Sequence, residues 1–236
     1  MDRMQRTPNR PFEDWEGTYL REPEIYDSFS QSEDPDNRTF KKLLELVSLD
    51  HKAVLEIGCG SGRYTELLAS VCEQLFALDI SQPLLRLARK KCESSRTVQF
   101  LHCSAQNIPL PDRSVDLVFA GWVLSAMTSR AVRDRSMAEI LRVLSDDGGV
   151  WLFENHHESE FMAMRGYPPE VTDFVEDYRF DVRATMKTDI RFPSLDEAKR
   201  VLGYIFRDRG LKYLDRTQDP RIGHKIDILH RPNRPL

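Results

Sequence analysis

The chain has 236 residues, of which 40% are hydrophobic and 31% are charged, and its formal net charge at pH 7 is -4. This composition is typical of an ordinary folded protein, and the length suits one α/β domain. Domains that bind nucleic acid through phosphate contacts are usually clearly basic, so the charge balance disfavours a nucleic-acid partner. No run approaches the roughly 18 apolar residues that cross a bilayer, and the N-terminal stretch lacks an apolar signal core. We therefore expect no membrane association and a cytoplasmic location.

The first 50 residues are expected to form a lid followed by the first helix. Residues 1–37 hold four prolines among many charges, which disfavours regular structure, yet they also carry several aromatic side chains. Such a segment can close over a ligand. Apolar residues at helical spacing then predict a helix over about 38–48.

Residues 51–155 alternate short apolar runs with amphipathic segments, and this pattern predicts a parallel sheet covered on both faces. Helices are expected from about Arg63, from Ser81, and over a third stretch that Gly148 and Gly149 would end. The five predicted strands read AVLEI, QLFALDI, TVQFLH, VDLVFAGW and GVWLFEN.

The last 81 residues are less regular, and we interpret 156–193 as an insertion on the substrate side of the site. Regular patterning returns over 194–236. Ser194 and Glu197 have the spacing of a capping box, and Gly210 is expected to end the helix that they begin. LKYLDRT and HKIDILH then read as a pair of antiparallel strands. The whole chain, 1–236, is predicted to be a single domain.

The segment LEIGCGSGRYTELLA places Gly58, Gly60 and Gly62 between a strand and a helix. Glycine is needed where φ is positive or where a ligand would meet a Cβ atom, and ligands of open α/β folds bind at this edge of the sheet. A dinucleotide loop usually reads G-x-G-x-x-G, but here the third glycine comes one residue early. The carboxylate of Glu56, just before the loop, suits a cationic amino acid better than a pyrophosphate. The loop therefore favours S-adenosylmethionine over a nicotinamide cofactor.

Asp79 ends the second predicted strand, about twenty residues beyond the loop, where an acidic residue accepts hydrogen bonds from ribose hydroxyls. The alternative is that Asp79 caps the next helix. Ser81 already offers a cap next to Pro83, so the ribose role is the better interpretation.

Four segments resemble, in order, the successive motifs of the class I S-adenosylmethionine-dependent methyltransferases: VLEIGCGSGRYTELLA, LFALDIS, FLHCSAQNIPLPDRSVDLVFAGWVL and ILRVLSDDGGVWLFEN. The resemblance covers about 50–155 closely and extends to about 230. It implies a Rossmann-like three-layer α/β sandwich with a seven-stranded, mostly parallel sheet whose last strand is antiparallel. It also implies S-adenosyl-L-methionine as cofactor and S-adenosyl-L-homocysteine as product. The implied cofactor-binding residues are Glu56, Gly58, Cys59, Gly60, Asp79, Ile80, Ser104, Ala105, Gln106, Gly121 and Trp122.

Methyl transfer from a sulfonium is an in-line displacement, so alignment and exclusion of water matter most. A hydroxyl acceptor would also gain from a general base. His156 and His157 follow the fifth predicted strand on the substrate side and are the candidates for this base, with Glu154 a weaker third. The alternative is that both histidines are solvated loop residues. The candidate substrate-binding residues are Tyr19, Tyr26 and Tyr167, although such aromatic residues more often serve packing.

These features predict an enzyme that methylates oxygen or nitrogen of a small-molecule acceptor. An RNA or protein acceptor is the first alternative, disfavoured because the chain has no basic run. A regulatory protein that binds the cofactor without turnover is the second, since fold does not imply function. The four cysteines lack zinc or redox spacing, so they predict buried free thiols and no metal site.

Overall fold

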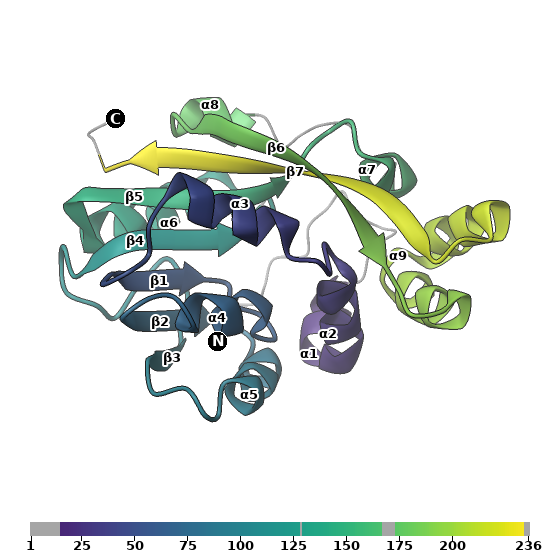
Figure 1. Cartoon of the computed structure of the whole chain (residues 1–236), viewed down its shortest axis with the longest axis horizontal. Helices are drawn as coiled ribbons and strands as arrows, with labels where there is room; N and C mark the ends of the chain where they lie inside the picture. Colours follow the sequence, from purple (N-terminus) through teal and green to yellow (C-terminus); the bar gives the residue numbers. More distant parts are fainter. Residues whose placement is uncertain (1–14, 128, 167–172, 234–236) are drawn as a thin grey trace.

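The computed structural model describes residues 15–127, 129–166 and 173–233, in which seven strands form one sheet in the order β3-β2-β1-β4-β5-β7-β6 (Figure 1). Neighbouring strands run parallel except in the two pairs that involve β7, so β7 alone is antiparallel to the rest. The predicted sheet is confirmed. The strands are β1 (Ala53–Ile57), β2 (Gln74–Asp79), β3 (Val98–His102), β4 (Val115–Gly121), β5 (Leu144–Asn155), β6 (Asp181–Arg191) and β7 (Arg221–Pro232).

Helices cover both faces of this sheet, which gives the predicted three layers. One face packs against α3 (Arg38–Leu46), α4 (Arg63–Ala69) and α5 (Gln82–Lys91). The other packs against α6 (Arg130–Val143) and α8 (Asp173–Asp177). Side chains alternate between the faces along each strand. Phe119 of β4 therefore joins the first layer, and its neighbour Val118 joins the second.

Four further helices gather beyond the carboxyl ends of β1 and β4: α1 (Trp15–Leu20), α2 (Pro23–Ser32), α7 (Glu160–Arg165) and α9 (Leu195–Thr217) (Figure 1). The rings of Phe29, Phe161 and Phe206 join them into a second apolar cluster. The expectation that prolines keep residues 15–32 irregular is wrong. Pro23 stands in the first turn of α2, where its missing N–H removes no helical hydrogen bond.

The structure corrects the prediction for the C-terminal third. LKYLDRT is not a strand, because residues 211–217 complete α9. Gly210 lies inside this helix, whose backbone departs from helical geometry at Arg207, with φ of 54° and ψ of -137°. The partner of β7 is instead β6, inside the predicted insertion. The Ser194 cap is confirmed by a 3.1 Å hydrogen bond from the Glu197 N–H to its hydroxyl.

Gly148 and Gly149 were expected to end a helix, but both lie within β5. Helix α6 already ends at Val143, and the chain passes directly into the strand. A Cβ atom at Gly148 would lie 2.8 Å from the backbone oxygen of Asp116, near the amino end of β4. Glycine is therefore needed here for the close approach of two strands. No helix among the residues that the structure describes is long and apolar enough to cross a membrane.

Replacing Gly62 by Ala tests how α4 is seated on α5. Gly62 has φ of 90°, and an added Cβ would lie 2.8 Å from the Ala88 backbone. Backbone strain and overpacking together should lower the free energy of unfolding by about 2–4 kcal/mol in urea denaturation. The matched control is Gly121→Ala, where the nearest atom would lie at 3.6 Å, and the expected change is under about 1 kcal/mol. Equal effects at both positions would contradict this account.

Candidate active site

The glycine loop joins β1 to α4 with three residues in the left-handed region of φ: Gly58 at 68°, Gly60 at 54° and Gly62 at 90°. Their surroundings differ. A Cβ at Gly60 would lie 2.7 Å from the hydroxyl of Tyr26, and one at Gly58 would lie 2.5 Å from Val123. Gly58 and Gly60 thus face the end of β4 and the N-terminal segment, whereas Gly62 serves the packing of two helices.

Asp79 closes the loop from the end of β2. Its two carboxylate oxygens accept hydrogen bonds from the N–H groups of Gly60, at 2.8 Å, and Ser81, at 2.7 Å. The side chain is buried, and this burial raises the pKa of the carboxyl group although the backbone hydrogen bonds act in the opposite direction. Each carboxylate oxygen has two lone pairs, so Asp79 can hold the loop and still accept hydrogen bonds from a ligand. Ser81 is the cap of α5, as predicted.

Glu56 is 3% exposed, and its carboxyl accepts a 2.6 Å hydrogen bond from the hydroxyl of Thr65. Burial raises the pKa of Glu56 to about 8. A cation placed beside the carboxyl would lower this pKa again, because opposite charge favours the ionised form. The site can therefore accept the positive end of an amino-acid cofactor by losing a proton.

A small cavity of about 20 Å³ lies between the loop and the N-terminal segment. Sites for ligands of drug size usually measure several hundred Å³, so the crevice is closed in this conformation. The loop glycines and the two carboxylates have the chemistry that S-adenosylmethionine needs, but the cavity is too small to hold it. The residues that line the cavity are Tyr26, Ser30, Glu33, Glu56, Gly58, Cys59, Arg63, Tyr64, Gly121 and Trp122.

The N-terminal segment is fastened to this crevice by polar contacts. The buried guanidinium of Arg63 donates to the backbone oxygens of Ser30, at 2.9 Å, and Asp34, at 3.1 Å. Ser81 donates its hydroxyl to the backbone oxygen of Tyr19, at 2.8 Å. The Tyr19 and Tyr26 rings meet edge to face at 5.2 Å, so the structure brings both predicted lid residues to the loop.

The predicted adenine-side residues lie on two adjacent loops. His102, at the end of β3, is hydrogen-bonded at 3.1 Å to the backbone oxygen of Ile80. The residue Ile80 is 52% exposed. Ser104 and Gln106 follow on the next turn, where the Ser104 hydroxyl accepts from the Gln106 N–H at 3.2 Å. Ala105 between them is buried. The structure therefore places these residues together, while their contacts with a cofactor stay a prediction.

The end of β4 meets β5 and β7 through three side chains, two of which the sequence analysis did not single out. Trp122 Nε1 donates to Asn155 Oδ1 at 3.1 Å, and His224 Nε2 lies 2.7 Å from the same oxygen. Burial, together with the guanidinium groups of Arg63 and Arg165, lowers the pKa of His224 to about 3. One signal was present: a histidine interrupts the apolar alternation of the last strand, whose antiparallel direction brings its start to the end of β5.

The predicted bases lie elsewhere. The rings of His156 and His157 stack at 4.4 Å beyond the end of β5, and neither residue lines the cavity. His156 Nδ1 accepts a 3.1 Å hydrogen bond from the N–H of Glu158. Glu154 is buried and accepts from the Ser125 hydroxyl at 2.6 Å, and burial raises its pKa to about 7. Their catalytic roles stay predictions. Tyr167 lies outside the described residues.

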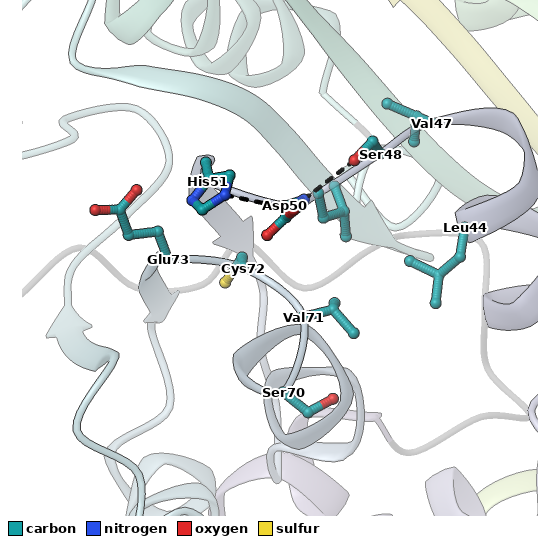
Figure 2. Close-up of a pocket in the computed structure, with 10 residues that line it drawn as sticks. Leu44, Val47, Ser48, Asp50, His51, Ser70, Val71, Cys72 and Glu73 are labelled. Atoms are coloured by element: carbon teal, nitrogen blue, oxygen red, sulfur yellow. Dashed lines mark hydrogen bonds and ion pairs between the residues drawn. The ribbon is translucent and has the colours of Figure 1, made fainter.

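A larger concavity, about 580 Å³, lies at the opposite edge of the sheet, where loops lead into β1 and β2 (Figure 2). Its polar groups are engaged with one another: Ser48 accepts from the Asp50 N–H at 3.3 Å, and Asp50 lies 3.5 Å from His51. The larger volume thus lies at the edge of the sheet opposite the glycine loop. The buried carboxylates and the glycine loop belong to the small cavity at the carboxyl edge.

Comparison with known proteins agrees with this geometry. Residues 55–152 match the profile of a family described as a methyltransferase domain. A probable S-adenosylmethionine-dependent methyltransferase of Mycolicibacterium smegmatis is 29% identical over 144 residues, which cover 56% of this chain and 53% of that protein. Residues 55–152 of this chain are thus similar to S-adenosylmethionine-dependent methyltransferases. S-adenosylmethionine is accordingly the cofactor for which the loop, Glu56 and Asp79 are suited.

One further relative and one solved structure with a similar fold carry the names of methyltransferases with different acceptors. A malonyl-[acyl-carrier protein] O-methyltransferase of Methylococcus capsulatus is 26% identical over 140 residues, covering 58% of this chain and 50% of that protein. A Haemonchus contortus phosphoethanolamine N-methyltransferase, solved with phosphoethanolamine and S-adenosylhomocysteine, shares the fold with a TM-score of 0.53 at 17% identity, covering 90% of this chain and 44% of that chain. This chain spans about half the length of the two curated relatives described.

The raised pKa of Glu56 predicts a pH dependence of stability. In the unfolded chain this carboxyl ionises near its ordinary pKa of 4.5, whereas in the folded protein it holds its proton up to about pH 8. Stability from this group is therefore fully present below pH 4.5 and falls as the pH rises toward 8. Glu56→Gln, which keeps an acceptor for Thr65, should lose less stability than the wild type between these pH values. If the free energy of unfolding, measured in urea, fell equally with pH in the two proteins, this prediction would be contradicted.

Proposed function

We propose that this protein is an enzyme that transfers a methyl group to oxygen or nitrogen of a small molecule. The observation that carries the proposal is the enclosed polar cavity between the glycine loop and the N-terminal segment, with Trp122, Asn155 and His224 beside it. A cavity closed by the chain's own α2 suits an acceptor small enough to be enclosed. The O- and N-methyltransferase relatives support the two acceptor atoms.

The residues divide into two groups by position. Gly58, Gly60 and Glu56 would hold the methionine end of the cofactor, and Asp79 would hold its ribose. When bound, the cofactor supplies a methyl group on a positively charged sulfur. Trp122 lines the cavity and stacks with His224 at the start of β7, so it would flank the space where cofactor and acceptor meet and help to exclude water. The protein acts chiefly by alignment.

The N-terminal helices act as the lid in this proposal. The hydroxyl of Tyr26 lies close to Gly60 and would occupy space that the cofactor needs. Arg63 and Ser81 bind the backbone of the same segment. Opening must break these contacts, and closing over the bound cofactor can re-form those made to backbone atoms. A small acceptor would then react in a site closed to bulk water.

Calorimetric titration with S-adenosylmethionine and S-adenosylhomocysteine tests the cofactor site. The wild type should bind both, and Asp79→Asn should bind about 10- to 100-fold more weakly, because a charged hydrogen-bond acceptor is lost. Asp146→Asn is the control. Asp146 is exposed, lies near the amino end of β5 away from the glycine loop, and pairs with Arg113 at 3.0 Å. A wild type that binds neither compound would overturn the proposed function.

The lid predicts an effect on the rate of binding. Lys91 on α5 forms an ion pair with Asp27 on α2, and both side chains are about one-quarter exposed. Such a pair contributes up to about 1 kcal/mol, so Lys91→Met should raise the association rate constant of S-adenosylhomocysteine up to about fivefold. Stopped-flow tryptophan fluorescence measures this rate. Lys42→Met removes a pair within α3 and should leave the rate unchanged. No acceleration in the Lys91 variant would contradict the lid.

A further inference from the structure

His224 is a buried histidine whose second ring nitrogen is unsatisfied. The side chain is 2% exposed, and its ring lies between Trp122, at a centroid distance of 6.3 Å, and Phe161, at 5.2 Å. Its Nδ1 atom is buried and has no hydrogen-bond partner among the described residues. A buried polar atom without a partner costs free energy, so a ligand that supplies a donor gains by pairing with it.

The hydrogen bonds of its neighbours fix which nitrogen of His224 carries the proton. The indole N–H of Trp122 can only donate, so the atom of Asn155 that faces it must be the amide oxygen. That oxygen also lies 2.7 Å from His224 Nε2 and can only accept. Nε2 is therefore the donor. A neutral imidazole has one N–H, which leaves Nδ1 with a free lone pair.

The charges around the ring keep it neutral. Arg63, from α4, and Arg165, from α7, both disfavour the imidazolium form, as does burial. The carboxyl group of Glu33, which follows α2, faces the same two guanidinium groups, and its burial raises its pKa to about 7. An acceptor that arrives as an ammonium ion would be repelled by the arginines and has no lone pair for methylation. A hydroxyl group is neutral and donates while keeping lone pairs.

The strand direction places His224 at the carboxyl edge of the sheet, where the acceptor would bind. Because β7 runs antiparallel to β5, His224 near its start lies at the carboxyl edge, beside the residues that end β4 and β5. Trp122 contacts His224 on one side and lines the cavity on the other. His224 therefore lies directly behind a residue that lines the cavity.

We propose that Nδ1 of His224 binds the hydroxyl hydrogen of the methyl acceptor and so orients its oxygen, which makes a neutral hydroxyl compound the substrate class of this site. The proposal rests on the proposed function, and it deepens it from oxygen or nitrogen to the oxygen of a hydroxyl group. In the transfer the S–CH3 bond breaks as the O–CH3 bond forms, the sulfur keeps the electron pair, and the hydroxyl proton passes by way of Nδ1 to water when the site opens. His224 is in this account an acceptor-binding residue that is neutral before and after the transfer.

The tautomer is testable without any acceptor. Long-range ¹H–¹⁵N correlation spectra of protein labelled at histidine should show His224 as the Nε2–H tautomer across about pH 5–8, with no imidazolium. Comparison with His224→Gln assigns the signal. A proton on Nδ1, or titration of this ring near the ordinary histidine pKa, would overturn the proposal and would leave the cofactor site untouched.

Two substitutions separate the roles of the two nitrogens. His224→Gln keeps a donor near the Nε2 position for Asn155 but removes the acceptor at Nδ1, whereas His224→Asn places an amide near Nδ1 and loses the Nε2 contact. With methyl-labelled S-adenosylmethionine and a metabolite extract, the Gln variant should lose about tenfold in kcat/KM for the labelled product and the Asn variant should lose less. A purely structural role predicts the reverse order, following the stability of the two variants.

The control is His230→Gln, on the same strand, where the ring packs on Trp151 at 4.3 Å, and it should match the wild type. Mass spectrometry of the labelled products should find methyl ethers. Products labelled only on nitrogen, carbon or sulfur, or equal kcat/KM in the wild type and His224→Gln, would overturn the hydroxyl proposal alone. Failure of the wild type to bind S-adenosylmethionine, or binding without any labelled product, would instead overturn the proposed function.

Discussion

The guanidinium of Arg63 connects the two parts on which the site depends. It belongs to the first turn of α4, directly after the glycine loop, and it donates to two backbone oxygens at the end of α2. A buried cation is costly unless it is hydrogen-bonded, and the carbonyl of Ser30 lies in the last turn of α2, where carbonyl groups lack helical partners. Each side thus satisfies the other. The position of the lid is consequently set by the same residue that begins the cofactor-side helix.

Buried acids are the second constraint on this edge of the sheet. Glu33, Glu56, Asp79 and Glu154 are all buried there, and burial raises the pKa of each. Holding several carboxyl groups away from water opposes folding whenever they ionise. Such an arrangement stabilises little by itself, and perturbed acids of this kind are common at functional sites. The closed crevice is poised for a positively charged ligand, since the ligand's charge would relieve the cost of ionising Glu56.

The sequence predicted the part of the fold in which local pattern and tertiary role agree. Strands β1 to β5 are apolar runs, and the loop after β1 carries glycine where φ is positive. The edge strand β6 was missed although Val182, Ala184, Met186 and Ile190 stand at alternate positions, because most of its side chains are exposed and charged residues are interspersed among them. LKYLDRT has such alternation but is helical, with Tyr213 and Leu214 packed against the α2 and α7 layer. Tertiary packing decided both cases.

The site followed the same rule. Glu56, the loop glycines and Asp79 could be proposed from the sequence because the loop pattern that singles them out is local, and the structure brings them together at one edge of the sheet. Asn155 and His224 are 69 residues apart and meet only through the pairing of β5 with β7. The predicted bases, His156 and His157, are adjacent in the sequence and lie beyond the end of β5, and their catalytic role stays a prediction. The histidine in the apolar alternation of the last strand was a signal, but it did not identify Asn155 as the partner, because that pairing depends on the order of strands in the sheet.

The long edge strand β6 has a consequence for how the protein behaves at high concentration. Apart from a bridge between Glu33 and Ile190, no described strand pairs with its outer edge, so a row of main-chain donors and acceptors faces solvent. Arg183, Lys187 and Arg191 are exposed along it. Two molecules that met edge to edge would have to bring these cations together and strip them of water, and this discourages open-ended stacking into fibres.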